Sequence, residues 1–108
     1  MKRISARQAA LNAARKPIAR AQLLRFNYCE FKAAGGPGEC YGNLSVHEPW
    51  SRGRGGPIAD ARNQVTVCFE HNRMISQNAE TMRWATEKGF LVHSAFGADW
   101  LAQGGFQR

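Results

Sequence analysis

Three cysteines and a histidine give this 108-residue sequence its first recognisable chemistry. Two residues separate Cys68 from His71, a spacing that one turn of chain can bring to a single ion. Cys29 and Cys40 form a second pair across a loop rich in glycine and proline. Structural zinc takes four such ligands in a tetrahedron, usually as two pairs from separate segments. The sequence therefore predicts a structural Zn²⁺ site that uses every cysteine, over the alternative of three free thiols and a surface histidine.

A second set of polar residues, His47, Glu48 and Asn72, lies between these pairs and just after them. Hydrolysis of a phosphodiester needs a divalent cation at the scissile phosphate, a general base that activates water, and positive charge that holds the flanking phosphates. The three side chains can supply the base and the cation ligands if they meet in the fold. Arg52 and Arg54, on a glycine-rich turn, can hold phosphate. Each residue alone also fits an ordinary strand end or loop, but the ordered set favours a nuclease site.

A strand–loop–strand–helix unit must position these residues. Residues 44–47 form a short apolar segment that ends on His47, and residues 64–68 alternate apolar and polar side chains, so both are predicted as strands. Residues 71–77 are predicted as a helix. The unit requires the second strand and its helix to fold back on the first strand.

The segments around this unit are assigned more coarsely. Asn78 is predicted to cap a further helix over residues 79–88, with Gly89 at its C-terminal stop. Residues 26–31 are expected to form a short strand or a turn, and residues 90–92 a short strand or an apolar strap. The sequence assigns no structure to the last ten residues.

The whole excess positive charge lies at the N-terminus. The formal charge is +7, and residues 1–25 hold seven basic residues and no acidic one, while the rest of the chain balances. Helices are predicted over residues 5–15 and 18–26, with Pro17 between them. We expect this basic helical arm to contact nucleic-acid phosphates, the alternative being a solvated tail. The basic residues assigned to nucleic-acid binding are Lys2, Arg3, Arg7, Arg15, Lys16 and Arg20, together with Arg52 and Arg54.

The run from Val46 to Asn72 resembles the HNH (His-Asn-His) endonuclease family. In that family a His-His pair precedes an Arg-x-Arg-Gly-Gly turn and an Asn…Cys-x-x-Cys-His segment. Here residues 46–48 read Val-His-Glu, residues 52–56 read Arg-Gly-Arg-Gly-Gly, and residues 63–72 run from an asparagine through Cys-x-x-His to a second asparagine. The resemblance is strongest to small bacteriophage HNH proteins. It implies an α+β, zinc-stapled ββα-metal (His-Me finger) domain over residues 26–95, with flanking helices.

The resemblance also implies roles for individual residues. His47 and Asn72 fall on positions that bind the catalytic divalent cation (Mg²⁺, Mn²⁺ or Ni²⁺), and Asn63 falls on the asparagine that fixes the loop and the base. Glu48 stands where the family has its general-base histidine, and His71 replaces a zinc cysteine. An alternative stays open in which His47 is the base and Glu48 a metal ligand.

The predicted function is metal-dependent hydrolysis of DNA, as a nick or a double-strand cut. One alternative is a zinc-stapled DNA-binding module without catalysis, and another is a phage interaction protein with an apolar contact surface of Trp50, Trp84, Trp100 and Phe106. The expected partners are double-stranded DNA and, within a phage, DNA-packaging proteins; a monomer and a dimer both stay open. No apolar run approaches the ~20 residues that span a bilayer, so the expected location is the cytoplasm of a bacterial host. Residues 96–108 are treated as a C-terminal tail and residues 1–25 as the arm.

Overall fold

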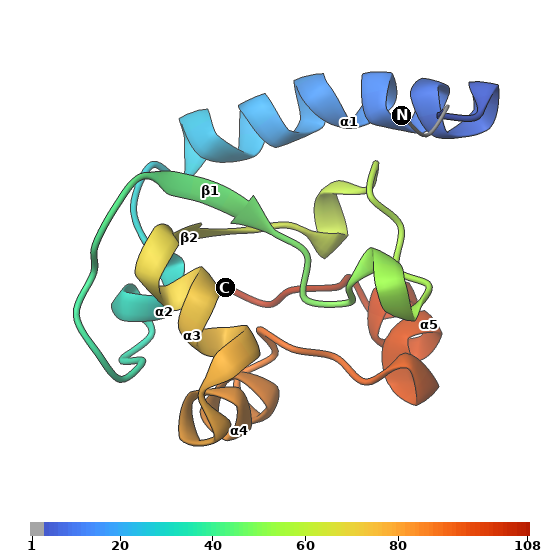
Figure 1. Cartoon of the computed structure of the whole chain (residues 1–108). Coiled ribbons are helices and arrows are strands. Elements are labelled where there is room, and N and C mark those ends of the chain that lie inside the picture. The colour runs from blue at the N-terminus through green and yellow to red at the C-terminus, as the bar shows by residue number, and fades with distance from the viewer. Residues whose placement is uncertain (1–3) are drawn as a thin grey trace.

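The computed structural model describes residues 4–108, which form a small α+β structure around a two-stranded antiparallel sheet (Figure 1). Its helices and strands are α1 (Ala6–Arg25), α2 (Glu30–Ala33), β1 (Leu44–His47), β2 (Val65–Cys68), α3 (Phe69–Gln77), α4 (Ala79–Glu87) and α5 (Ser94–Ala102). Two short 3₁₀ turns, Arg52–Arg54 and Ala61–Asn63, lie in the loop between the strands. Within the described part of the chain, no helix is long and apolar enough to cross a membrane.

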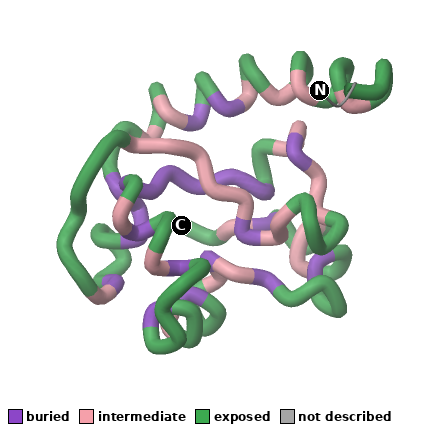
Figure 2. The backbone as a smooth tube through the Cα atoms, viewed as in Figure 1, coloured by how far each residue is buried: buried purple, intermediate pink, exposed green. Residues whose placement is uncertain are grey.

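Strand β2 of the sheet lies within the apolar core. β1 and β2 pair antiparallel, with His47 opposite Val65, which confirms both predicted strands. All four residues of β2 are buried, as the purple segment in Figure 2 shows. The rings of Phe31 and Phe90 pack against each other beside this strand, with centroids 5.2 Å apart. The core therefore fixes the strand ends from which the candidate site is built.

Helix α1 is continuous, so the prediction of two helices separated at Pro17 is wrong. A single 20-residue helix carries Pro17 in its interior. Proline lacks an N–H, which removes one helical hydrogen bond; Pro17 is exposed, where water can satisfy the freed carbonyl. Ser5 caps the helix as expected, its hydroxyl accepting from the N–H of Gln8 at 3.1 Å. Because α1 lies along the sheet and contacts both strands, it is packed against the body (Figure 1).

Side-chain caps set the boundaries of α3 and α4. Helix α3 begins two residues before the predicted start, because Cys68 Sγ caps it by accepting from the N–H of His71 at 3.4 Å. Asn78 caps α4 as predicted, its Oδ1 accepting from the N–H of Thr81 at 2.9 Å. Gly89 follows α4 with φ of 83°, the left-handed conformation that favours glycine at a helix stop.

For two short segments, the structure decides between the alternatives that the sequence left open. Residues 26–31 form no strand; the chain turns there into α2, with Cys29 as its N-cap. Residues 90–92 form an apolar strap and no strand. The N–H of Val92 donates to the carbonyl of Pro49 at 3.0 Å, which holds the strap against the end of β1.

The C-terminal segment packs onto the body through α5 and the last residue. The predicted boundary between residues 95 and 96 falls inside α5. Gly97 is buried where a Cβ would lie 2.3 Å from the ring of Trp50, so only glycine allows this close approach. Arg108 returns to the buried carboxylate of Glu30, with Nε 2.7 Å from Oε1.

Two of the aromatic residues considered as a contact surface instead pack inside the molecule. The rings of Trp84 and Phe90 stack with centroids 5.9 Å apart, and Phe106 lies 4.9 Å from the same Phe90 ring. Trp50 is covered by α5, and Trp100 is half-buried. Packing within the molecule therefore involves Trp84, Phe106 and Trp50.

Candidate metal centre and active site

The four predicted zinc ligands meet where β2 passes into α3. Nδ1 of His71 is 3.3 Å from Sγ of Cys29, 3.7 Å from Sγ of Cys40 and 3.2 Å from Sγ of Cys68. All four ligand atoms lie within 4.8 Å of one another. Zinc with Zn–S bonds of about 2.3 Å and Zn–N bonds of about 2.0 Å would place such atoms about 3.5 Å apart in a tetrahedron. The Cys₃His cluster therefore fits the structural zinc that the sequence predicts.

The second ring nitrogen of His71 orients the ring for metal binding. Nε2 lies 3.0 Å from the carbonyl oxygen of Pro37 and 3.2 Å from that of Gly38. Because carbonyl oxygens only accept, Nε2 carries the proton and Nδ1 presents its lone pair to the three sulfurs. The loop between Cys29 and Cys40 thus brings these two widely spaced ligands to one site, and its carbonyl groups set the tautomer of His71.

In the metal-free protein the thiols differ in proton affinity. Desolvation of the thiol where it meets the other ligands, followed by the contacts with Cys68 and Cys29, raises the pKa of Cys40 to about 12. Burial also acts to raise the pKa of Cys68, but the backbone N–H groups of His71 and Tyr41 and the neighbouring thiols outweigh it, and the pKa is lowered. Metal ligands bind as thiolates, so zinc binding would release protons from this cluster.

A second candidate site is built around His47 at the end of β1. Its Nε2 lies 2.7 Å from the carbonyl oxygen of Phe90, so Nε2–H donates and Nδ1 keeps a lone pair. Burial is the largest influence on the pKa of His47 and lowers it, against the opposing effects of the Phe90 carbonyl, the charge of Glu48 and the side chain of Asn72. The ring is therefore neutral at pH 7 and can accept a proton or bind a cation.

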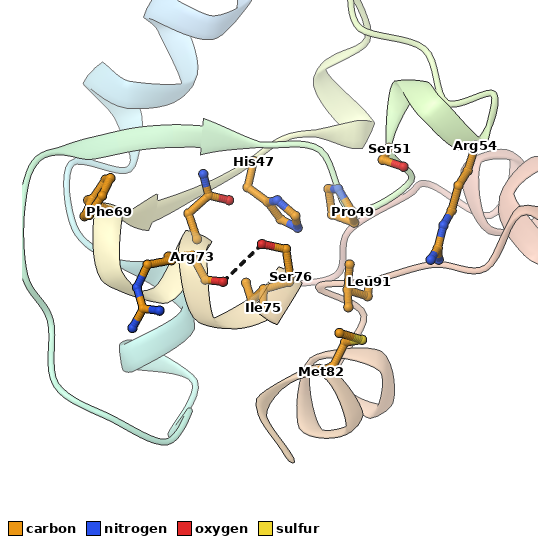
Figure 3. A pocket seen from close by; sticks show the side chains of 11 residues that line it. His47, Pro49, Ser51, Arg54, Phe69, Arg73, Ile75, Ser76, Met82 and Leu91 are labelled. Atoms are coloured by element: carbon orange, nitrogen blue, oxygen red, sulfur yellow. Dashed lines mark hydrogen bonds between the residues drawn. The ribbon is translucent and has the colours of Figure 1, made fainter. Parts of the chain in front are cut away.

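His47 and Asn72 line two adjoining pockets. The pocket on the α4 side has a volume of 420 Å³ and the one on the α1 side a volume of 290 Å³. Figure 3 shows Arg54 and Arg73 on opposite sides of His47 in the larger pocket. The smaller pocket adds the side chains of Glu48, Arg15 and Arg52. Three of the four predicted catalytic residues thus share one depression with several guanidinium groups.

Glu48 lies in this depression already paired with two arginines. Its Oε2 accepts from Nη2 of Arg15 at 2.9 Å, and its Oε1 lies 3.5 Å from Nη2 of Arg52. The Glu48 side chain is only 10% exposed, which limits the screening of these ion pairs by solvent. Arg52 is thereby placed beside the candidate catalytic residues, and α1 contributes Arg15 to the same place.

Asn63 holds the loop that follows β1. It is fully buried, and its Nδ2 donates to the carbonyls of Trp50 and Pro57, each at 2.8 Å. Its Oδ1 accepts from the N–H of Trp50 at 2.9 Å. All three hydrogen bonds go to the loop that carries Arg52 and Arg54, so Asn63 positions this loop and does not line the pockets around His47.

The remaining basic residues of the predicted DNA contact lie mostly on α1. Arg7, Lys16 and Arg20 are exposed. Arg7 and Arg52 line a further pocket between α1 and the glycine-rich loop. Lys2 and Arg3 lie outside the described residues. Helix α1 therefore adds positive charge to the side of the site where Glu48 lies.

Comparisons of the chain with protein-family models, with curated protein sequences and with solved structures found no match. The resemblance to HNH endonucleases therefore rests on the sequence motifs quoted above. The structure itself shows a small α+β protein with an antiparallel hairpin and a Cys₃His cluster that could bind a metal.

Sequence reasoning missed two features of the site. The Phe90 carbonyl that orients His47 is a backbone acceptor, which leaves no trace in residue types. Arg73 could have been found, because four of the α3 residues that line the larger pocket recur at helical spacing. These residues are Phe69, Asn72, Arg73 and Ser76.

Proposed function

We propose that this protein is a divalent-metal-dependent endonuclease of the HNH type that hydrolyses phosphodiester bonds in DNA. The observation that carries the proposal is the meeting of His47, Glu48 and Asn72 at one depression, beside Arg15 and Arg52. These residues come from β1, its following loop and α3, the elements that a ββα-metal fold would use. The separate Cys₃His cluster joins the start of α2 and the loop after it to the junction of β2 and α3, so a zinc there would hold these segments together.

His47 is the better candidate for the general base. Its neutral ring is held by the Phe90 carbonyl, and Nδ1 has a lone pair that can take a proton from water. Both carboxylate oxygens of Glu48 already face guanidinium groups. For Glu48 to serve as the base, at least one of these arginines would have to move away.

Asn72 and Glu48 offer oxygen ligands for a catalytic cation, and Glu48 would do so only after Arg15 or Arg52 moves from its carboxylate, for example to a DNA phosphate. Carboxylate and amide oxygens suit Mg²⁺ and Mn²⁺, which commonly complete their coordination with substrate phosphate and water. Among residues 4–108, one group of three or more His, Cys, Asp or Glu side chains could hold a metal, and it is the Cys₃His cluster. The second site therefore offers a partial set of ligands, to which DNA would contribute. A cation there would supply positive charge to the phosphate and to the leaving oxygen.

The basic side chains would place the DNA backbone across the site. Arg54 and Arg73 flank His47 in the larger pocket, and Arg15 and Arg52 adjoin it in the smaller one. Arginine donates in a planar fork that matches phosphate oxygens. The exposed charges along α1 would add a salt-sensitive contact beyond the site.

Cleavage of supercoiled plasmid with Mg²⁺, Mn²⁺ or Ni²⁺ tests the proposal. We expect metal-dependent cleavage that His47→Ala abolishes. His93→Ala is the matched control, because His93 is an exposed histidine that caps α5 away from the site. Failure of the zinc-loaded wild-type protein to cut with any of these metals, or equal cutting by the His47→Ala variant, would refute the proposal.

The ion pairs of Glu48 favour one alternative, a zinc-stapled DNA-binding module without catalysis. In that case Arg15 and Arg52 would keep Glu48 permanently occupied, and binding would depend on exposed charge alone. The Lys16→Gln, Arg20→Gln double variant should then weaken DNA binding and its salt dependence, while His47→Ala has no effect on binding and no cleavage occurs. Removal of α1 is a poor test, because α1 packs on both strands.

A further inference from the structure

Phe69, the first residue of α3, is an aromatic side chain left on the surface beside the candidate site. It is 56% exposed and lines the 420 Å³ pocket together with Asn72. Its backbone N–H donates to the carbonyl of Asn43 at 3.0 Å, so the start of the helix that carries the ring is fixed. An exposed aromatic ring on a fixed backbone, within a polar site, offers a surface for stacking.

The opposite end of the same pocket is apolar. Figure 3 shows Pro49, Leu91 and Met82 lying on the far side of His47 from Phe69. Met82 is 36% exposed, so part of this apolar surface is open to solvent. The pocket therefore has apolar surface on both sides of the candidate catalytic residues.

The charges indicate what kind of ligand would use these apolar surfaces. Arg54 and Arg73 line the same pocket, which matches an anionic backbone. The guanidinium of Arg73 is also paired with Glu70, which leaves Arg54 as the charge that a ligand phosphate would meet. An apolar peptide would cover the apolar surface but offer Arg54 no anion. A regular duplex presents its phosphates outward and keeps its base faces stacked inside. An unpaired nucleotide offers both a phosphate and a flat base.

We propose that this groove binds nucleic acid whose bases are unpaired at the cleavage site, with a base next to the scissile phosphate stacked on Phe69. This rests on the proposed function for the position of the scissile phosphate. The sequence predicted double-stranded DNA as the substrate. This inference restricts the cleavage site to an unpaired segment, either within a duplex or at its end.

Binding without cleavage tests this inference separately from the nuclease activity. The full chain carrying His47→Ala is titrated with a short single-stranded DNA that contains 2-aminopurine, and with the matching duplex. We expect tighter binding of the single strand, with a change of 2-aminopurine fluorescence. Because one aromatic stacking contact is lost, adding Phe69→Ala should weaken single-strand binding roughly 5- to 150-fold and change duplex binding little.

Two variants control for loss of structure. Phe69→Tyr keeps a ring of similar size and should retain the affinity. Phe96→Ala removes an aromatic ring that is 67% exposed on α5 and outside the pocket, and should have no effect. Unchanged single-strand binding by Phe69→Ala, an equal loss for duplex, or no binding of single strands at all would overturn the inference. Stacking without any cleavage by the wild-type protein would support the binding of an unpaired base at Phe69 and refute the proposed nuclease together with its scissile phosphate.

Discussion

Cys40 gives the sharpest test of the Cys₃His cluster as a structural zinc site. It is the one exposed ligand of the four, so replacing it with alanine removes little apolar packing. Its Sγ contacts Nδ1 of His71 at 3.7 Å and lies among the other sulfurs. Any large effect of Cys40→Ala must therefore arise through the metal.

The expected size of the effect follows from the four-ligand geometry. Structural zinc sites contribute roughly 10–16 kcal/mol of apparent binding free energy near pH 7. An equal share for each of four ligands is roughly 2.5–4 kcal/mol. In a chain of this size, each kcal/mol shifts the melting temperature by about 4–6 °C. We therefore expect Cys40→Ala to lower the melting temperature of the zinc-loaded protein by roughly 10–25 °C.

Thermal unfolding followed by circular dichroism measures this, with and without a zinc chelator. The chelator should destabilise the wild-type protein strongly, and the wild-type and Cys40→Ala proteins should behave alike once zinc is removed. Metal analysis should find one zinc per wild-type chain. If Cys40→Ala leaves the melting temperature of the metal-loaded protein unchanged, or if the chelator has no effect, the zinc reasoning is wrong.

Further predictions concern the catalytic site and the core. Burial lowers the pKa of His47 below its ordinary value of 6.5. The rate of cleavage should therefore be constant around pH 7 and decline only below pH 6.5. If His47 is the base, the Glu48→Gln variant should show the same decline at acidic pH. Unfolded His47 takes up its proton near pH 6.5 while the folded ring does not, so the free energy of unfolding should also fall as the pH drops below 6.5, as urea titrations can show. Asn63→Ala leaves two carbonyls and one N–H of the loop without partners. The free energy of unfolding, measured with urea, should fall by about 2–4 kcal/mol, and cleavage should slow while zinc is retained. Full activity of this variant would contradict the role of Asn63 in holding the loop. Arg108→Ala removes the guanidinium that pairs with the buried carboxylate of Glu30. Because the side chain of Arg108 is 33% exposed, we expect the free energy of unfolding to fall by only about 1–3 kcal/mol. The control variant Arg83→Ala, at an exposed position, should cause no change.

The parts of the fold that the sequence predicted are those set by local chemistry. The alternation of residues 64–68 and the side-chain cap of Asn78 act within a few residues, so the strand and helix they specify are observed. The zinc ligands could be grouped because few residue types bind zinc and all the cysteines were needed. Cys29 and Cys40 could be paired on this ground in spite of their wide spacing.

What the sequence could not predict depends on packing between distant segments. Pro17 is tolerated inside α1 because it faces solvent, and this orientation is decided by how α1 lies on the sheet. The pair between Arg15 and Glu48 joins residues 33 positions apart. The closing contact of Arg108 with Glu30 spans 78 positions. No local pattern encodes such pairings, although the first of them decides which groups surround the candidate base.

The single-turnover rate of DNA cleavage by the His47→Ala variant, relative to wild type, tests the central claim most directly. Both preparations should hold one zinc per chain and be assayed with the same divalent metal at pH 7. Loss of a general base typically slows a reaction by 10² to 10⁴-fold, and we predict a fall in this range, with His93→Ala at the wild-type rate. Equal rates for the wild-type and His47→Ala proteins would contradict the claim that His47 is the reacting centre of a nuclease.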